Sequence, residues 1–279
     1  MGIGRSDRNL DTVDRRRFLA LTLAGGAALT GCGSTPSATP SSTTTTPPPT
    51  TTPPPTTPPA PSFPAPQLTR VPIPAGRLTE LPGEGSLLAW TVDDGDDSSV
   101  VRAYTEFGRD TGTRLTFFLN GSKPAWTENA DLLRPLVADG RIQLGNHTWS
   151  HADLTSLSAA GVQDELQRNH DFVLSTYGVD MRPYYRPPYG YRDASTDAAA
   201  AEIGYTCPVL WYGSLSDSGL LTPDQVVGFA DQWFLPQHIV IGHLNFTPVT
   251  TVFPQLTQII ADRGLTTVTL DDVFVRPTG

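Results

Sequence analysis

The chain has 279 residues and a formal net charge of −9. An excess of acidic side chains repels phosphate backbones, so this composition argues against nucleic acid as a partner. About 200 residues follow the two N-terminal segments described next, which is enough for one domain with a sizeable core.

The first 32 residues have the pattern of an export signal. Residues 14–19 (Asp-Arg-Arg-Arg-Phe-Leu) contain a twin-arginine pattern, and a mildly apolar run extends from 19 to 30. This run is shorter than the ~20 residues of a membrane-spanning helix, and its length is typical of a signal peptide. It ends in Leu-Thr-Gly before Cys32, which resembles the lipobox of bacterial lipoproteins. We therefore expect Cys32 to be lipidated. An ordinary signal peptide with a chance cysteine, and Sec instead of twin-arginine export, are the alternatives.

Residues 33–66 consist almost wholly of Ser, Thr, Pro and Ala. Such a segment cannot bury a core, and as an extended polyproline chain it would reach roughly 100 Å. We expect a linker that lets a domain anchored to the outer face of the cytoplasmic membrane reach into the cell wall. Loss of residues 1–32 would remove five Arg and three Asp, so the acidic excess would rise from 9 to 11. With Cys32 lipidated, Cys207 has no disulfide partner and is predicted to be a small core residue.

From residue 67 to residue 279 the composition is that of a folded domain, and apolar runs alternate with amphipathic stretches. We expect strands at 87–92, 115–119, 142–146, 183–186, 206–211, 239–242 and 266–270. We expect helices at 99–111, 129–138, 159–177, 194–203, 223–232 and 252–263. Repeated strand–helix alternation predicts an α/β fold with a parallel sheet, either doubly wound or closed into a barrel. Seven such units in so short a chain favour an irregular (β/α)7 barrel.

Two adjacent carboxylates end the first of these strands. Residues 91–95 read Thr-Val-Asp-Asp-Gly, so Asp93 and Asp94 precede a turn for which Gly95 supplies backbone freedom. Two buried like charges repel each other, and a cation removes the repulsion. One carboxylate can then bind a metal while the other stays free to accept a proton. A solvated Asp-Asp-Gly turn is the structural alternative.

Two histidines follow the third strand. Residues 147–151 read His-Thr-Trp-Ser-His. On a helical turn this spacing puts both imidazoles on one face, within reach of one metal. With Asp94 they would form an Asp-His-His set that leaves a position open for water, as catalytic metal sites do. Two surface histidines at a chance spacing are the alternative.

Arg186 and His243 also follow predicted strands. Arg186 precedes two prolines that stiffen its loop, and its guanidinium can pair with Asp93 and keep that carboxylate ionised and oriented. His243 ends the strand at 239–242, where an imidazole can act as a general acid. The C-terminal ends of parallel strands meet on one face of an α/β barrel, where active sites lie. A rigid surface turn and a histidine that merely ends a strand are the alternatives.

Four ordered motifs resemble those of the polysaccharide deacetylase family, the NodB-homology domain of carbohydrate esterase family 4. Residues 91–95 are similar to its first motif, usually Thr-Phe-Asp-Asp-Gly, and residues 147–151 match its second, His-(Ser/Thr)-x-x-His. Residues 186–190 (Arg-Pro-Pro-Tyr-Gly) match the third motif, and residues 241–243 (Ile-Gly-His) resemble the fifth, usually Leu-x-His. The resemblance covers residues 84–275, essentially the whole predicted domain.

The resemblance implies a role for each of these residues. Asp94, His147 and His151 would hold a divalent metal, Asp93 would be the catalytic base and His243 the catalytic acid. Zn²⁺ is the metal that this ligand set favours, with Co²⁺, Ni²⁺ and Mn²⁺ as alternatives.

The resemblance also implies residues that bind the substrate. The backbone N–H of Tyr189 would help to hold the oxyanion, and Trp211 and Ile241 could line a pocket for the acetyl group. The family's fourth motif usually has a Trp on the strand and an Asp-Trp pair some residues later. Trp211 and Asp217 fit this pattern, but Ser218 replaces the second Trp, which leaves open whether Asp217 holds the imidazole of the catalytic histidine.

The expected activity is hydrolysis of N-acetyl groups on N-acetylglucosamine or N-acetylmuramic units of a cell-wall or chitin-like polysaccharide, with release of acetate. An O-deacetylase of acetylated xylan and a non-catalytic wall-binding lipoprotein are the alternatives. We expect a monomer whose partners are the polysaccharide and, through the lipid anchor, the membrane.

Overall fold

The computed structural model describes residues 63–276 of the chain. The predicted export signal, its lipidation site Cys32 and nearly all of the predicted linker lie outside these residues. Within the part that is described, no helix has the length and apolar character needed to cross a membrane.

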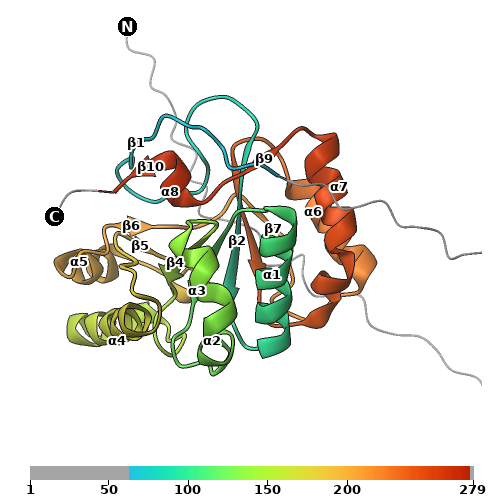
Figure 1. Cartoon of the computed structure of the whole chain (residues 1–279). Helices are drawn as coiled ribbons and strands as arrows, with labels where there is room; N and C mark the ends of the chain where they lie inside the picture. Colours follow the sequence, from blue (N-terminus) through green and yellow to red (C-terminus); the bar gives the residue numbers. More distant parts are fainter. Residues whose placement is uncertain (1–62, 277–279) are drawn as a thin grey trace, which may run out of the picture. The chain divides into compact units, whose positions relative to one another are not determined.

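A parallel sheet forms the centre of the domain (Figure 1). Its strands lie in the order β6-β5-β4-β3-β2-β8-β7, and each neighbouring pair is parallel. The strands are β2 (Leu87–Asp94), β3 (Leu115–Leu119), β4 (Ile142–Asn146), β5 (Tyr184–Tyr185), β6 (Cys207–Pro208), β7 (Gly213–Ser214), β8 (His238–His243) and β9 (Thr266–Thr267), which pairs with the start of β2. The long strands are buried along almost their whole length, as strands of a covered parallel sheet are. The sheet is curled into a half-barrel, which confirms the predicted α/β fold of the irregular (β/α)7 type.

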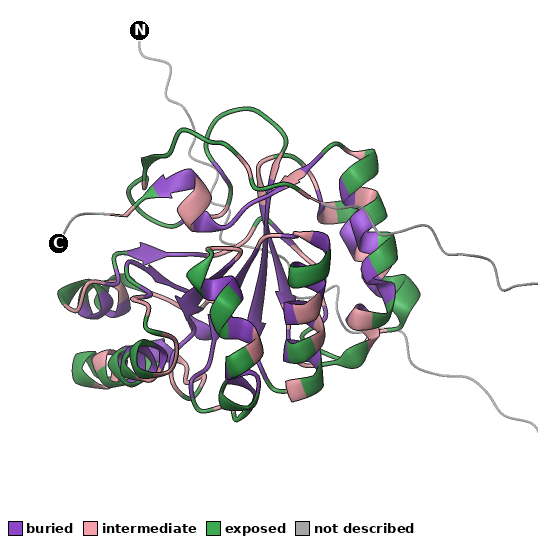
Figure 2. Ribbon diagram, in the orientation of Figure 1, coloured by how far each residue is buried: buried purple, intermediate pink, exposed green. Residues whose placement is uncertain are grey.

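Helices follow the strands and pack around the sheet, with buried residues inward and exposed residues outward (Figure 2). They are α1 (Ser98–Thr111), α2 (Ala125–Glu128), α3 (Ala130–Ala138), α4 (Ala159–Tyr177), α5 (Ala194–Glu202), α6 (Pro223–Trp233), α7 (Phe253–Asp262) and α8 (Leu270–Val273), with 3-10 turns η2 (Leu154–Ser156), η3 (Pro188–Gly190) and η4 (Thr247–Val252). An aromatic cluster joins β2 to α1 and α7. The Trp90 ring packs edge-on against Tyr104 at 5.7 Å, and Phe107 stacks on Phe253 at 4.3 Å. Such pairs contribute ~1 kcal/mol each beyond their buried area.

The predicted strand at 206–211 is wrong in its extent. The chain forms only β6 and β7 here, because the amides between them bond to three different segments in turn. The N–H of Val209 donates to the Tyr185 carbonyl, that of Leu210 to Leu78, and that of Tyr212 to Ile239. The segment therefore crosses from the β5 side of the half-barrel to the β8 side, and no single ladder can hold it.

The strand predicted at 266–270 is also too long. Only β9 forms there, because Thr269 and Asp272 make a capping box that starts α8. A short ribbon of β1 (Val71–Pro72) and β10 (Phe274–Val275) was not predicted.

β6 and β7 lie at the two edges of the half-barrel, and Arg186 binds the segment that crosses between them. Its guanidinium donates to the carbonyls of Val209 and Leu210 at 3.0 and 3.2 Å, and the side chain is fully buried. A charged side chain thus reaches this crossing segment from the end of β5.

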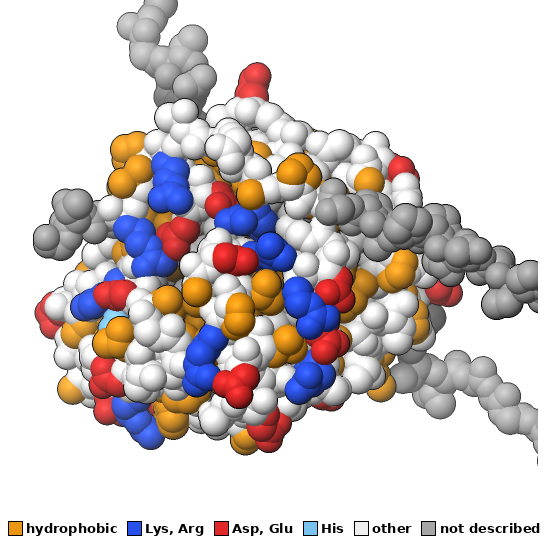
Figure 3. Space-filling model, viewed as in Figure 1, with side chains coloured by type: hydrophobic (Ala, Val, Ile, Leu, Met, Phe, Trp, Pro, Cys, Tyr) orange, Lys and Arg blue, Asp and Glu red, His pale blue; other side chains and the backbone are white. Residues whose placement is uncertain are grey.

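The two ends of the sheet differ in what covers them (Figure 1). The β1–β10 ribbon and α8 lie at the end where the strands begin, whereas α2 lies at the end where β3 finishes. On the face shown in Figure 3, Lys and Arg side chains are interspersed with Asp and Glu, and no large patch carries one sign of charge. The predicted core residue Cys207 is a free, buried cysteine, and burial raises the pKa of its thiol to about 12.

Candidate active site

The C-terminal ends of the strands surround a cavity of about 460 Å³. Eight of the predicted site residues line it: Asp93, Asp94, His147, His151, Tyr189, Trp211, Ile241 and His243. The other two, Arg186 and Asp217, are buried behind this lining. The structure therefore brings together residues that are up to 150 positions apart in the sequence, because parallel strands end on one face.

Both carboxylates of the Asp-Asp pair face the cavity, which a regular strand would not allow. Successive side chains of a strand point to opposite faces, but Asp94 has a left-handed backbone with φ of 74°. Gly95 follows with φ of 102°, and a Cβ there would lie 2.5 Å from the Trp126 ring. Trp126 also donates its indole N–H to the Asp94 carbonyl at 3.1 Å. The expected need for glycine at this turn thus has a steric cause as well.

The prediction that His147 and His151 lie on a helical turn is wrong. Residues 147–151 form a loop in which Thr148 has φ of 71° and His151 has φ of 64°. The side chain of Asn146 accepts from the Thr148 N–H at 2.9 Å, and the Thr148 hydroxyl accepts from the His151 N–H at 3.1 Å. These local bonds compete with helical ones and hold the loop in its non-helical form.

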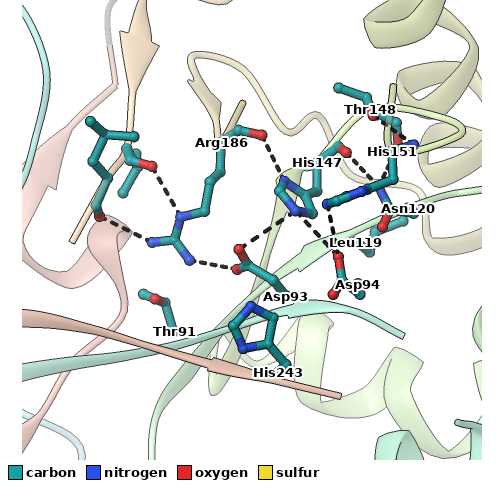
Figure 4. A network of polar contacts seen from close by, with 12 residues as sticks. Thr91, Asp93, Asp94, Leu119, Asn120, His147, Thr148, His151, Arg186 and His243 are labelled. Atoms are coloured by element: carbon teal, nitrogen blue, oxygen red, sulfur yellow. Dashed lines mark hydrogen bonds and ion pairs between the residues drawn. The ribbon is translucent and has the colours of Figure 1, made fainter. Parts of the chain in front are cut away.

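The loop nevertheless brings the two imidazoles to one carboxylate oxygen (Figure 4). The Nε2 atoms of His147 and His151 lie 3.3 and 3.4 Å from Oδ1 of Asp94. The His147 Nδ1 lies 2.7 Å from the Arg186 carbonyl oxygen, so Nδ1 carries the proton and Nε2 is free as a ligand. One ligand atom from each of the three residues fits within 4.8 Å.

These residues fit a divalent cation. Oδ1 of Asp94 is buried and has no hydrogen-bond partner among the described residues, although it faces two nitrogen ligands. Burial alone would raise the pKa of Asp94, but the neighbouring His147, with smaller contributions from His243 and Asn245, outweighs it and holds the pKa far below its usual value. The carboxylate is therefore ionised at neutral pH, as a metal ligand must be. Burial, and next the neighbouring His147, lower the pKa of His151, which favours the neutral imidazole.

The predicted pair of Arg186 and Asp93 is present. The guanidinium Nη1 donates to Oδ1 of Asp93 at 2.5 Å, and both side chains are almost fully buried. The ring of Phe118 lies under the guanidinium at 4.2 Å. Oδ2 of Asp93 faces the other way, 3.6 Å from the His147 Nε2, so one oxygen is held and the second is presented to the cavity.

His243 is held by Asp217, the contact that the altered fourth motif had left open. Oδ1 of Asp217 lies 3.0 Å from the His243 Nδ1, and the carboxylate is buried. Burial would lower the pKa of His243, but the Asp217 hydrogen bond and charge, with smaller contributions from Asp93 and Asp94, raise it above its usual value. The imidazole is thus biased toward its proton-donating form.

The remaining predicted residues shape the rim and wall of the cavity. Tyr189 has a left-handed backbone with φ of 60°, and its half-exposed ring packs 4.6 Å from that of His151. Trp211 packs near Arg186, with 5.8 Å between the indole ring and the guanidinium carbon. Ile241 is buried on β8. These contacts set an aromatic and apolar wall beside the polar centre.

Sequence reasoning missed several residues of the cavity. Asn245 donates to Oδ2 of Asp94 at 2.7 Å. Asn120 donates to the carbonyls of His147 and Thr148, and Lys123 forms an ion pair of 2.5 Å with Asp96. Asn120 directly follows β3 and Asn245 lies two residues past β8. The strand-end rule that identified the charged and aromatic residues would have found both, had uncharged amides been included.

Comparison with known proteins supports the resemblance. Residues 81–208 match the family model described as "Polysaccharide deacetylase". Among curated proteins, the chain is 33% identical to a chitin deacetylase of Pestalotiopsis sp, over 48% of this chain and 44% of that protein. It is 27% identical to a peptidoglycan-N-acetylglucosamine deacetylase of Listeria monocytogenes, over 67% of this chain and 38% of that one. The matched segment thus spans less than half the length of each of these two relatives.

Solved structures share the fold. A structure described as T48 deacetylase with substrate is 29% identical, with a TM-score of 0.59 and coverage of 67% of this chain and 89% of that one. The chitin deacetylase of Colletotrichum lindemuthianum has a TM-score of 0.65 at 22% identity, covering 74% and 94%. A family pseudoenzyme of Bacillus anthracis has the same fold, with a TM-score of 0.63 at 18% identity and coverage of 73% and 72%. Residues 81–208 thus resemble a polysaccharide deacetylase domain, and the neighbours below 25% identity show that the fold is shared.

Proposed function

We propose that this protein is a metal-dependent hydrolase that removes N-acetyl groups from a cell-wall or chitin-like polysaccharide and releases acetate. The observation that carries the proposal is the Asp94 oxygen, buried and unpartnered between two imidazole nitrogens beside a second carboxylate. A structural cation would need its coordination closed by the protein, whereas here the ligands border an open cavity.

Each reacting atom has a candidate partner in this geometry. A divalent cation held by Asp94, His147 and His151 would polarise the acetyl carbonyl and supply activated water. Asp93 would take the proton from the attacking water through its free oxygen, while the Arg186 bond fixes the carboxylate. The carbon–nitrogen bond breaks as the amine leaves.

His243 would give its proton to the leaving amine nitrogen, and its raised pKa keeps that proton available near neutral pH. The backbone N–H of Tyr189 would stabilise the oxyanion, and a donor of this kind typically contributes about 3 kcal/mol. Tyr189 lines the cavity at a left-handed turn of the chain, which supports this assignment.

Two alternatives keep a specific observation in their favour. A bifunctional xylanase/xylan deacetylase of Cellvibrio japonicus is 25% identical over 63% of this chain, which favours an O-deacetylase as the second candidate. The structural similarity to the Bacillus anthracis pseudoenzyme makes a non-catalytic binding protein the other candidate to test. The paired Asp93 and the complete Asp94, His147 and His151 set argue for turnover.

Location is part of the proposal. An N-terminal lipid anchor at Cys32 and an extended linker would hold the domain at the outer face of the cytoplasmic membrane, within reach of peptidoglycan. We therefore place peptidoglycan first among the substrates and chitin-type oligomers second. Metabolic labelling with a radioactive fatty acid, compared between the parent and Cys32→Ala, would test the anchor, and equal labelling of both would reject it.

Acetate release by the purified protein tests the activity. Peptidoglycan, N-acetylglucosamine oligomers and acetylated xylan are each incubated with and without a chelator. Release from an N-acetylated glycan that the chelator abolishes and Zn²⁺ restores is the expected result. Release from xylan alone would replace the proposal by the O-deacetylase, and no release from any substrate by metal-loaded protein would reject hydrolysis of these glycans.

A further inference from the structure

Asp94 uses its two oxygens differently, and the difference depends on a residue outside every motif considered above. Oδ1 faces the imidazoles of His147 and His151 and has no hydrogen-bond partner among the described residues. Oδ2 accepts a hydrogen bond of 2.7 Å from the side-chain amide of Asn245. One oxygen is therefore available to a cation, and the other is already bound.

The orientation of the Asn245 amide is determined by both of its neighbours. Its nitrogen must face Asp94, because a carboxylate can only accept. Its oxygen faces the backbone N–H of Asp96 at 3.4 Å, and that group can only donate. The reversed amide would place two acceptors together at one end and two donors at the other.

The backbone around Asn245 is tied to the same strand end that carries the carboxylate. The N–H of Leu244 donates to the Asp93 carbonyl at 2.9 Å, and the N–H of Asp97 donates to the Leu244 carbonyl at 3.1 Å. The backbone of the loop after β8 is therefore fixed relative to the end of β2, so the Asn245 amide reaches Asp94 from a defined position.

We propose that Asn245 is a positioning residue that holds Asp94 as a one-oxygen metal ligand and thereby sets the affinity of the site for its cation. The inference rests on the proposed metal site. A carboxylate that turned to offer both oxygens would occupy a coordination position otherwise open to water and substrate. Hydrogen-bonded partners of metal ligands typically change metal affinity by about 10- to 100-fold when removed.

The test is the dissociation constant for Zn²⁺, measured by competition with a chromophoric chelator on the purified full chain. Asn245→Leu keeps a similar volume and removes the donor, and we expect it to weaken binding by about 10- to 100-fold. Ser218→Ala is the matched control, because Ser218 lines the same cavity and no described hydrogen bond joins its side chain to Asp94, His147 or His151. The Zn²⁺ affinity of this variant should stay within about twofold of the parent's.

A double-mutant cycle separates positioning from general damage. If Asn245 acts through Asp94, Asn245→Leu should have little further effect on Zn²⁺ affinity in an Asp94→Asn background, because the carboxylate is already absent. The melting temperatures of the metal-free proteins, compared in parallel, show whether Asn245→Leu simply unfolds the loop. X-ray absorption of the zinc-loaded variant gives the number of oxygen ligands, which should rise.

Three results are distinguishable. If the parent protein binds no divalent metal, the proposed function fails and the inference fails with it. If the parent binds Zn²⁺ and Asn245→Leu binds it equally well, only the inference is overturned. Equal losses in the parent and Asp94→Asn backgrounds would also overturn it, because the effect would not pass through the carboxylate.

Discussion

The two halves of the candidate site are held in place by different means. On the side of the proposed metal ligands, residues with left-handed backbones at Asp94, Thr148 and His151 are fixed by several side-chain hydrogen bonds. On the side of the proposed proton donor, the hydrogen bonds described for the His243 ring reduce to one, which its Nδ1–H donates to the Asp217 carboxylate. Several hydrogen bonds thus fix the proposed metal ligands, whereas the described side-chain hydrogen bonds fix the His243 ring at one atom only. Substitutions should therefore affect metal binding in one half and pH dependence in the other.

Asp93 lies between the two halves, and its replacement should have the largest effect. Asp93→Asn should keep the metal but lower turnover by about 10²- to 10⁴-fold, because an amide cannot accept the proton. It also leaves the buried Arg186 without its counter-charge, which should destabilise the fold by about 3 kcal/mol. Metal analysis, acetate release and thermal unfolding of one preparation check all three, and near-parent turnover would refute the assignment of the base.

His147→Ala should remove the metal. A ligand contributes more than the groups behind it, so we expect Zn²⁺ affinity to fall by more than about 100-fold. The ring also bonds to the Arg186 carbonyl, so the variant should lose some stability as well. Metal stoichiometry of the purified variant is the measurement. His170→Ala is the control, because that histidine bonds to Tyr205 away from the cavity and should leave stoichiometry unchanged.

Asp217→Asn should change the pH profile and leave metal stoichiometry as in the parent. Asp217 raises the pKa of His243, so the protonated donor persists to higher pH in the parent. Without the charge, the alkaline limb of kcat/KM should move to lower pH by about 1–2 units, the size of a hydrogen bond to a charged group. Stability follows the same sign, since the stabilisation by protonated His243 is complete at low pH and is lost as the pH rises through its folded-state pKa. If the alkaline limb did not move, Asp217 would not control the pKa of the proposed acid, His243.

A pair of glycine substitutions compares the backbone of the two halves. Gly95→Ala should destabilise the fold by about 1–3 kcal/mol, because the new methyl group meets the Trp126 ring at a left-handed position. At Gly219, beyond Asp217, an added Cβ has no heavy atom within 4 Å, so Gly219→Ala should change stability by less than about 0.5 kcal/mol. Urea unfolding of both variants gives the comparison, and equal losses would contradict the difference between the halves.

Some of this site could be predicted from sequence, and the reasons are local. Asp93, His147, Arg186 and His243 follow apolar runs, and parallel strands must end on one face, so their convergence followed from the order of elements. The non-helical course of the loop after β4 did not, because it depends on Asn146 and Thr148 hydrogen bonds that compete with a helix. The crossing segment after β6 could not be predicted either, since its amide partners lie at Leu78 and Ile239, far along the chain.

Arg186 binds the segment that crosses from β6 to β7 with the same guanidinium that holds Asp93. One side chain therefore links the placement of this segment to the orientation of the Asp93 carboxylate. In a molecule whose crossing segment has not yet docked, Arg186 lacks the carbonyls of Val209 and Leu210, and the guanidinium beside Asp93 is less restrained. We therefore expect the proposed activity to appear during refolding together with the docking of this crossing segment.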